Sequence, residues 1–256
     1  MTSIPLDDRG LLLGDGLFET VLAVDGELVD LAAHLDRMAA GCAVLRLPSL
    51  DRVLAERRMR EALAAVSTPR AAVRLTLTAG SGGRGLDRPP APDLRLFATA
   101  AASAQPLGPA RLIISSVRRN EGSPVSRLKT LSYLDNVLAR AEAAERGADE
   151  ALMLNSRGEV AGAAAANLFW VREGRLFTPA LESGVLAGTM RARVLAAAGR
   201  LGVEAAEVRA PAQDLMTAEA VFLTNSLVGV RAVSVVDEVV FGTCALVERL
   251  ANEAGV

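Results

Sequence analysis

Lysine is almost absent from this sequence: Lys129 is the only one in 256 residues, beside 27 arginines. A coding bias toward arginine is the simplest cause, and a lysine on a solvated surface would tolerate that replacement. Lysine differs chemically because its amine can lose a proton when buried and attack a carbonyl, whereas guanidinium stays charged. The count therefore leaves two interpretations of Lys129 open, a surface residue kept by chance and a nucleophilic amine.

Histidine is equally scarce, and His34 is the only one. A zinc site of the HExxH kind needs two histidines, so that class is excluded. A Ser-His-Asp or Cys-His centre would have to use His34, which lies in a helical pattern without a serine or cysteine motif. We therefore interpret His34 as a helix-face residue near the core, and we predict no metal site.

Cysteines, long apolar runs and an excess of positive charge are also missing. Cys42 and Cys244 lie far apart in the sequence, as reduced thiols of a cytoplasmic protein do. Charges interrupt every apolar run, although 51% of the residues are hydrophobic, so no span of a bilayer is expected. The first residues lack the regions of a signal peptide. A net charge of −2 does not favour nucleic acid. We expect a cytoplasmic protein with no membrane or nucleic-acid partner.

The first hundred residues alternate between strand and helix patterns. Asp25-Gly26 is a strong signal for a tight hairpin between two strands. Apolar residues recur at three- and four-residue spacing in the helical stretches and alternate in the strands. Strands are predicted at 19–24, 27–31, 71–79 and 93–100, and helices at 32–47 and 50–66. The small, proline-punctuated stretch 100–110 is typical of a linker.

The remainder mixes strands and helices without a regular βαβ repeat. Strands are predicted at 111–117, 150–155, 159–171, 175–180, 203–208, 220–225 and 229–241, and helices at 132–147, 189–202 and near the end. This mixture predicts an α+β (mixed α/β) fold with two lobes. We place a smaller lobe at 1–105 and a larger lobe, which carries Lys129, at 106–256.

A glycine-rich loop, Gly80 to Gly85, matches the GxGxxG pattern of dinucleotide sites. Such a site requires a helix to begin in the loop, because its N-terminus faces the pyrophosphate. Pro89, Pro90 and Pro92 follow at once and block that helix. Two interpretations remain: a flexible hairpin, or a loop that approaches a ligand closely and uses Arg84 to clamp a carboxylate.

Several segments, in order along nearly the whole chain, resemble the fold-type IV, or class IV, aminotransferase family of pyridoxal 5'-phosphate (PLP) enzymes. The segments are LDDRGLLLGDGLFET, HLDRM, GSGGRG, KTLSYLDNVLARAEAAERGADEALMLNSRGEV, NLFW, TPALESGVLAGTMR and FLTNSLVGV. The resemblance implies a two-lobed, D-amino-acid aminotransferase-like fold with PLP between the lobes, and a homodimer.

Within the family, the loop TAGSGGRG and the run ADEALMLNSRGEV with AANLFW are most similar to the 4-amino-4-deoxychorismate lyase branch. That branch eliminates pyruvate from aminodeoxychorismate to give 4-aminobenzoate for folate synthesis. Branched-chain and D-amino-acid aminotransferases share the same framework. The resemblance therefore implies a lyase first, and an amino-acid aminotransferase as the alternative.

The resemblance also implies residue roles. Lys129 matches the lysine that holds PLP as a Schiff base and moves protons at the substrate. The phosphate is assigned to an arginine, to the start of a helix and to a loop after a strand: Arg37, Gly188, Thr189, Met190, Asn225 and Ser226. Tyr133 is assigned to the cofactor ring or its hydroxyl, with helix packing as the other interpretation. Phe18, where some D-amino-acid enzymes carry tyrosine, and Arg84 are assigned to the substrate. Ser132 replaces a usual asparagine, and we assign it no role.

The sequence departs from the family at one charged position. The family carries a glutamate five residues before the asparagine of the NLF segment, where it pairs with the pyridine nitrogen; this chain has Gly162 there. Glu159 is the nearest acid, but its odd spacing predicts the opposite strand face unless a bulge intervenes. A weaker electron sink should slow amino transfer more than an elimination driven by aromatisation. A relative that binds PLP with little turnover is the further alternative.

Overall fold

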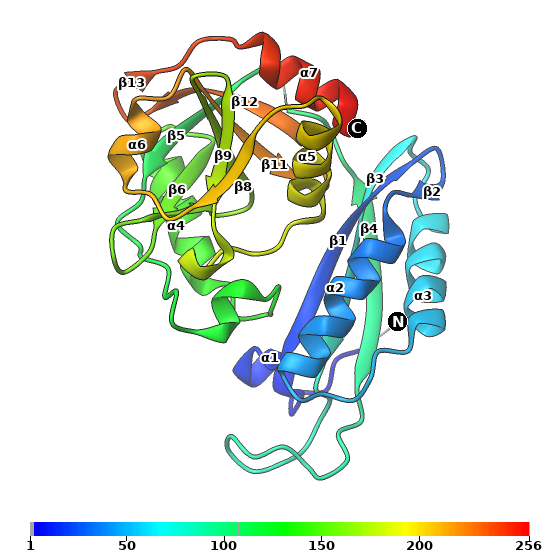
Figure 1. Cartoon of the computed structure of the whole chain (residues 1–256). Coiled ribbons are helices and arrows are strands. Elements are labelled where there is room, and N and C mark those ends of the chain that lie inside the picture. Colours follow the sequence, from blue (N-terminus) through cyan, green and yellow to red (C-terminus); the bar gives the residue numbers. More distant parts are fainter. Residues whose placement is uncertain (1–2, 107, 256) are drawn as a thin grey trace. The chain divides into compact units, whose positions relative to one another are not determined.

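The computed structural model describes residues 3–106 and 108–255 and divides them into two units (Figure 1). Unit 1 comprises Met1–Ala104 and Leu128–Ser132, and unit 2 comprises Gln105–Arg127 and Tyr133–Val256. The division after Ala104 falls inside the predicted linker. The short segment with Lys129 belongs to unit 1, whereas the sequence pattern placed it in the second lobe.

Unit 1 is a four-stranded antiparallel sheet covered by two long helices (Figure 1). Its strands, in the spatial order β2-β1-β3-β4, are β1 (Gly16–Val24), β2 (Glu27–Leu28), β3 (Arg70–Thr78) and β4 (Arg95–Ala102). Its helices are α1 (Arg9–Leu13), α2 (Leu31–Val44) and α3 (Arg52–Ala64). The structure confirms the predicted hairpin at Asp25-Gly26 and the two predicted helices, which are α2 and α3. The short α1 was not predicted.

The two faces of this sheet differ in character because side chains alternate along each strand. Leu17, Val21 and Ala23 of β1 join the apolar cluster that includes Leu35 and Met38 of α2. Burial of this face supplies the hydrophobic stabilisation of unit 1. The even-numbered residues of β1 point to the other face, away from these helices.

The segment Leu128–Ser132 runs beside the start of β1. The backbone N–H of Phe18 donates to the carbonyl of Lys129 at 2.9 Å, and that of Leu131 donates to Gly16 at 3.0 Å. This pairing joins residues that are far apart in the sequence, which local patterns do not reveal.

Unit 2 is built on a mixed nine-stranded sheet. The path runs β10-β9-β8-β11-β12-β5-β6-β7, and β13 pairs with β12. The strands are β5 (Ala110–Ile114), β6 (Glu150–Leu154), β7 (Val160–Ala163), β8 (Asn167–Arg172), β9 (Arg175–Pro179), β10 (Ala205–Val208), β11 (Ala220–Asn225), β12 (Gly229–Val236) and β13 (Val239–Val240). The helices are α4 (Leu134–Glu145), α5 (Thr189–Arg200), α6 (Ala212–Met216) and α7 (Ala245–Ala254), with short 3-10 turns at Pro124–Arg127 and Leu181–Ser183.

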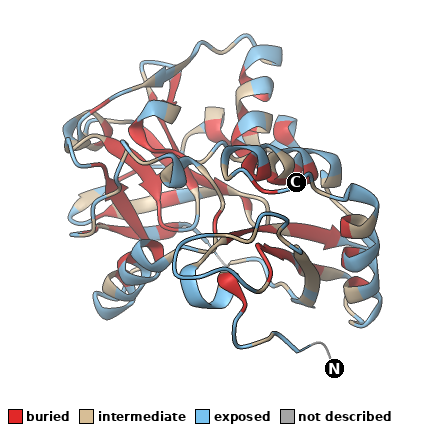
Figure 2. Ribbon diagram, turned by 90° about the horizontal axis from the view of Figure 1, so that it is seen from below, coloured by how far each residue is buried: buried red, intermediate tan, exposed pale blue. Residues whose placement is uncertain are grey.

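Both faces of the central strands of unit 2 are buried, as the red strands of Figure 2 show. Phe169 and Phe222 stack with ring centroids 5.1 Å apart on the face covered by α5 and α7. Trp170 and Leu215 lie in the cluster on the opposite face. This two-sided burial explains the near-continuous apolar runs of β8 and β11.

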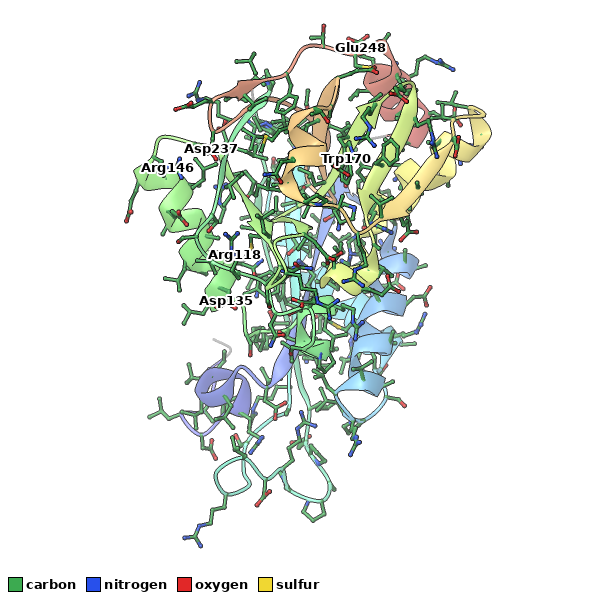
Figure 3. All side chains as sticks on the ribbon, turned by 60° about the vertical axis from the view of Figure 1, so that its left-hand side comes forward. Arg118, Asp135, Arg146, Trp170, Asp237 and Glu248 are labelled. Carbon is green, nitrogen blue, oxygen red and sulfur yellow. The ribbon has the colours of Figure 1, made fainter. Side chains whose placement is uncertain are left out.

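Two predicted strands are interrupted. The predicted strand 159–171 is the pair β7 and β8, separated at 164–166. The predicted strand 229–241 breaks after β12, where Asp237 has a φ of 49°. Its carboxylate accepts a bond at 2.9 Å from Arg146, the residue that follows the last residue of α4 (Figure 3). This bond connects the turn to the C-terminal end of α4. The α+β fold class is confirmed, and among the described residues no helix is long and apolar enough to cross a membrane.

Candidate functional site

Lys129 lies on the helix-free face of the unit 1 sheet. Its Nζ is 4.2 Å from the centre of the Phe18 ring, and the guanidinium carbon of Arg74 is 3.8 Å from the same centre. Phe18 is 7% exposed, so a buried ring contacts both cationic groups. The structure therefore brings the predicted residues Lys129 and Phe18 together.

Arg74 is a candidate residue that the sequence patterns did not single out. It lies in β3 two residues from Thr76, which is directly opposite Phe18. The alternation of β3 places Arg74 and Thr76 on the same face. Arg74 is exposed and contacts the same ring as the lysine, and such an arginine can bind a substrate carboxylate. The charged side chain inside the apolar stretch 71–75 of β3 was the available signal, but its use required the strand register.

Arg37 is anchored within unit 1 by a buried carboxylate. Its Nε donates to Oε1 of Glu19 at 2.7 Å and its Nη2 donates to Oε2 at 2.6 Å. Nδ1 of His34 lies 2.7 Å from Oε2 of the same residue. His34 is buried on α2, as its helical pattern predicted, but it has a charged partner rather than purely apolar packing.

In unit 2, the predicted phosphate residues lie where α5 begins. Gly188 is the N-cap residue of α5, so no side chain of the cap residue bonds to the first N–H groups of the helix. Nδ2 of Asn167 donates to the carbonyl of Leu186 at 2.8 Å, which fixes the approach to the helix. A Cβ on Gly188 would lie 1.9 Å from Oδ1 of Asn167, so only glycine fits this contact. The backbone N–H groups at the start of α5 suit an anion.

A buried hydroxyl lies on the same sheet face as this helix. Thr224 pairs with Asn167 across β11 and β8, two residues beyond the stacked Phe222 that packs against α5. Thr224 is 1% exposed, and its Oγ1 has no hydrogen-bond partner among the described residues. A helix N-terminus beside an unsatisfied buried donor fits a phosphate group. Thr224 was not among the predicted residues, because lack of a partner has no sequence signal.

The loop after β11 is shaped by its own asparagine. Oδ1 of Asn225 accepts bonds from the backbone of Leu227 at 3.0 Å and Val228 at 2.9 Å. Its Nδ2 donates to the carbonyl of Ala165 at 3.3 Å. The Asn225 side chain therefore sets the conformation of the loop that carries Ser226.

Gly162 occupies a β-bulge in β7. It lies opposite Met153, while Val160 lies opposite Leu154, so β7 has one extra residue between these pairs. Gly162 has a φ of 112°, a conformation that L-residues rarely adopt. The bulge that could bring Glu159 onto the Gly162 face is therefore present.

Glu159 nevertheless has other partners. Its carboxylate accepts bonds from Nη2 of Arg209 at 2.8 Å and from Nδ2 of Asn155 at 2.7 Å. These bonds, led by that from Arg209, hold the pKa of Glu159 below its ordinary value. The carboxylate is ionised but engaged in an ion pair of its own.

Tyr133 precedes the first residue of α4, at the N-cap position. The start of this helix is held to the segment after β7, because Nδ2 of Asn136 donates to the carbonyl of Ala164 at 2.6 Å. Ala139 of α4 packs with Met153, the residue opposite Gly162. Tyr133 and Gly162 thus belong to neighbouring parts of the same α4–β6–β7 layer.

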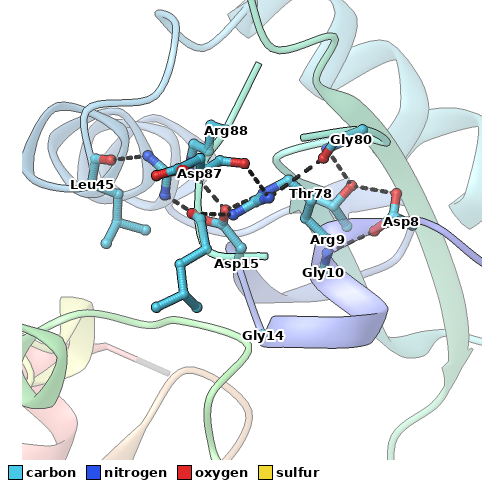
Figure 4. A network of polar contacts seen from close by, with 12 residues as sticks. Asp8, Arg9, Gly10, Gly14, Asp15, Leu45, Thr78, Gly80, Asp87 and Arg88 are labelled. Carbon is cyan, nitrogen blue, oxygen red and sulfur yellow. Dashed lines mark hydrogen bonds and ion pairs between the residues drawn. The ribbon is translucent and has the colours of Figure 1, made fainter. Parts of the chain in front are cut away.

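The glycine-rich loop of unit 1 is held by two other arginines, not by Arg84 (Figure 4). Arg9 donates to the carbonyls of Leu86 and Asp87, each at 2.9 Å. Arg88 bonds to Asp15, which also accepts from Arg9 at 2.9 Å. Burial would raise the pKa of Asp15, but the bonds from Arg88 and Arg9 outweigh it and lower that pKa.

Arg84 itself is exposed near the tip of that loop. Its backbone forms an isolated bridge with Asp87. The exposed guanidinium is compatible with a carboxylate ligand, and the role of Arg84 stays a prediction. Among the described residues, no group of three histidine, cysteine, aspartate or glutamate side chains could hold a metal ion.

Comparison with known proteins agrees with this arrangement. Residues 16–236 match the family described as amino-transferase class IV. The chain is 35% identical to a putative branched-chain-amino-acid aminotransferase of Methanocaldococcus jannaschii, covering 86% of this chain and 77% of the relative. It is 31% identical to an aminodeoxychorismate lyase of Vibrio harveyi, covering 91% and 87%.

A solved structure is also similar. The crystal structure of a putative 4-amino-4-deoxychorismate lyase from Legionella pneumophila has a TM-score of 0.92 and 28% identity, covering 98% of this chain and 93% of that one. The family match extends from β1 to the end of β12 and includes Lys129 and the start of α5. The chain therefore belongs to the class IV aminotransferase family of PLP-dependent enzymes.

Proposed function

We propose that this enzyme is a 4-amino-4-deoxychorismate lyase that releases pyruvate and forms 4-aminobenzoate. The observation that carries the proposal is Gly162, which leaves its strand position without a carboxylate, while Glu159 is paired with Arg209. Relatives named as lyases support it. The elimination removes a proton from the amine-bearing carbon and breaks the bond to the enol oxygen of pyruvate, and the ring becomes aromatic.

PLP supplies a carbonyl that captures the amine and a ring that accepts electrons. Lys129 is proposed to bind that carbonyl and then to move the proton at the amine-bearing carbon. Phe18 holds the Lys129 side chain by its ring face, and Arg74 beside it is proposed to bind a carboxylate of the substrate. Arg37, the start of α5 and the loop of Ser226 are proposed to hold the phosphate, and Tyr133 to contact the ring.

The weak electron sink favours elimination over amino transfer. Transfer must stabilise charge on the ring and reprotonate a cofactor carbon, so it depends strongly on a protonated pyridine nitrogen. In an elimination that makes an aromatic ring, the product itself supplies much of the driving force. The same contacts around Lys129 suit an aminotransferase, and the relative from Methanocaldococcus jannaschii favours that second candidate.

Product analysis separates the candidates. Purified enzyme with PLP is given aminodeoxychorismate, and 4-aminobenzoate and pyruvate are measured together. Parallel reactions contain leucine or D-alanine with a keto acid. We expect equal amounts of the two lyase products and slow amino transfer. Faster transfer would identify an aminotransferase, and bound PLP with neither activity would identify a binding protein.

Replacement of Thr224 by valine should separate cofactor binding from folding. We expect the Thr224→Val protein to bind PLP about tenfold more weakly, because a hydrogen bond to a charged group is lost. The cofactor-free protein should unfold at the same or a higher temperature, because an unsatisfied buried hydroxyl costs about 1–3 kcal/mol. PLP titration and thermal unfolding measure the two effects.

The matched control for Thr224 is Thr178, also buried in the unit 2 sheet. Its hydroxyl donates to the carbonyl of Leu168 at 2.8 Å. Thr178→Val should lower the free energy of unfolding by about 1 kcal/mol and leave PLP affinity unchanged. Equal PLP affinity in Thr224→Val and the native protein would remove Thr224 from the phosphate site.

We also propose a cytoplasmic homodimer. Each unit carries exposed apolar side chains of the kind that interfaces bury. In unit 1 these include Leu6, Leu11 and Leu12, which are 86%, 60% and 63% exposed, and in unit 2 Leu134, Val137 and Leu138, at 68%, 58% and 50%. The free cysteines Cys42 and Cys244 are compatible with a reducing compartment. Light scattering of the purified protein tests the dimer.

A further inference from the structure

The most completely buried charged cluster in unit 1 is the set Glu19, His34 and Arg37. The side chains of Glu19 and His34 are each 1% exposed, whereas that of Arg37 is 17% exposed. The carboxylate and imidazole therefore lie beneath the guanidinium, and Arg37 is the member that reaches out of the cluster.

A buried carboxylate in this position needs an explanation beyond packing. Glu19 lies in β1 between Leu17 and Val21, on the face that otherwise forms the apolar core under α2 and α3. Burying an ion pair seldom adds stability over apolar residues of the same volume. A leucine at this position would pack against Leu75, the residue opposite in β3.

The geometry of the pair fixes the guanidinium in one orientation. Glu19 accepts from Nε through Oε1 and from Nη2 through Oε2, so two parallel bonds hold one edge of the planar group. Nδ1 of His34, at 2.7 Å from Oε2, fixes the carboxylate in turn. Burial would raise the pKa of Glu19, but the bonds from Arg37 and His34 outweigh it and keep the carboxylate ionised.

We propose that Glu19 and His34 are positioning residues that orient Arg37 toward the phosphate of PLP. This rests on the proposed phosphate role of Arg37. Glu19 binds the edge of the guanidinium that carries Nε and Nη2. The guanidinium is therefore fixed in one orientation before the cofactor binds. The Arg37 side chain is then already ordered in the cofactor-free protein. PLP binding therefore does not have to supply the entropy cost of ordering it, and the affinity for PLP is not reduced by that cost.

The test compares PLP with pyridoxal, which lacks the phosphate, in the native protein and in Glu19→Gln. The amide cannot accept from both guanidinium nitrogens while His34 also faces it. We expect PLP affinity to fall about tenfold or more, as for loss of a bond to a charged group, and pyridoxal affinity to stay within about twofold. If Glu19 had only a structural role, its replacement would lower the affinities for PLP and pyridoxal equally. That result would overturn the proposal.

Asp8→Asn is the matched control. Asp8 is also buried in unit 1 and pairs with an arginine, because Nε of Arg95 is 3.0 Å from its Oδ2. This variant should lower the unfolding temperature and leave the ratio of PLP to pyridoxal affinity unchanged. An equal change of ratio in Asp8→Asn and Glu19→Gln would also overturn the proposal.

A second measurement needs no variant. Because His34 is the only histidine, its imidazole gives a single set of nitrogen resonances in a spectrum of labelled protein. We expect PLP to shift these resonances and pyridoxal to leave them nearly unchanged. Identical spectra with both ligands would contradict the proposal even if Glu19→Gln did not fold. Failure of the native protein to bind PLP would instead overturn the proposed function.

Discussion

Replacement of Lys129 by alanine should abolish turnover and the visible absorption of bound PLP. We expect activity to fall by at least about a thousandfold, because the variant loses the amine that is proposed both to capture the cofactor and to move the proton. The fold should persist, since the contact of this segment with β1 uses the carbonyl of Lys129 and not its side chain. Absorption spectra and product assays measure the two losses.

The composition makes this experiment unusually clear. With no second lysine, only the terminal amine could form another covalent link to PLP. Borohydride reduction of the native protein should therefore fix PLP to one peptide, the one with Lys129. Lys129→Arg is the stricter control, because it keeps the positive charge above Phe18 but cannot lose a proton. A cofactor band that survives in both variants would show that Lys129 is not the attachment site.

Replacement of Gly188 by alanine should damage both stability and cofactor binding. The new methyl group would lie 1.9 Å from Oδ1 of Asn167, in a region where backbone and side chain are both fixed. We expect the free energy of unfolding to fall by about 1–3 kcal/mol, as in other overpacked sites. PLP affinity should fall at least about tenfold, because α5 must shift away from the phosphate that its first N–H groups are proposed to bind.

Gly199→Ala in the same helix is the comparison. A Cβ there meets nothing within 4 Å, and alanine favours helix, so this variant should gain about 0.5–1 kcal/mol and bind PLP normally. Asn167→Ala should relieve part of the clash when combined with Gly188→Ala. Denaturant unfolding and PLP titration give both quantities. Equal behaviour of the two glycine variants would show that the Asn167 contact does not determine the start of α5.

Local patterns in the sequence predicted the long helices and most strands, because each of these has a clear apolar period, but not the short helices α1 and α6. They failed where the chain depends on distant partners. The break after β12 is the two-residue turn between the paired residues Val236 and Val239, and the Asp237 carboxylate in it accepts a bond from Arg146, which follows α4. The unit assignment of Lys129 depends on pairing with β1, which has no local signal. The bulge at Gly162 was considered because glycine in a strand often marks one.

The candidate site residues also divide into those that the sequence pointed to and those that only the folded structure revealed. Lys129 was singled out through its rarity, and Arg37 and the start of α5 through family resemblance, and their roles stay predictions. Arg74 required the register between β1 and β3, which brings it beside Phe18. Thr224 required a full account of hydrogen bonds in the folded chain. A buried hydroxyl without a hydrogen-bond partner, or a side chain that shares a sheet face with the candidate site, can be recognised only in the folded structure.

The contacts of Arg9 have a consequence for how this enzyme can diversify. Arg9 grips the glycine-rich loop by the main-chain carbonyls of Leu86 and Asp87, not by their side chains. Arg84 and Leu86 are exposed, and Leu86 is 84% exposed. These bonds are thus independent of the side chains of Arg84 and Leu86. Natural drift or a randomised library could therefore exchange the side chains of these two residues without the loss of the contacts from Arg9.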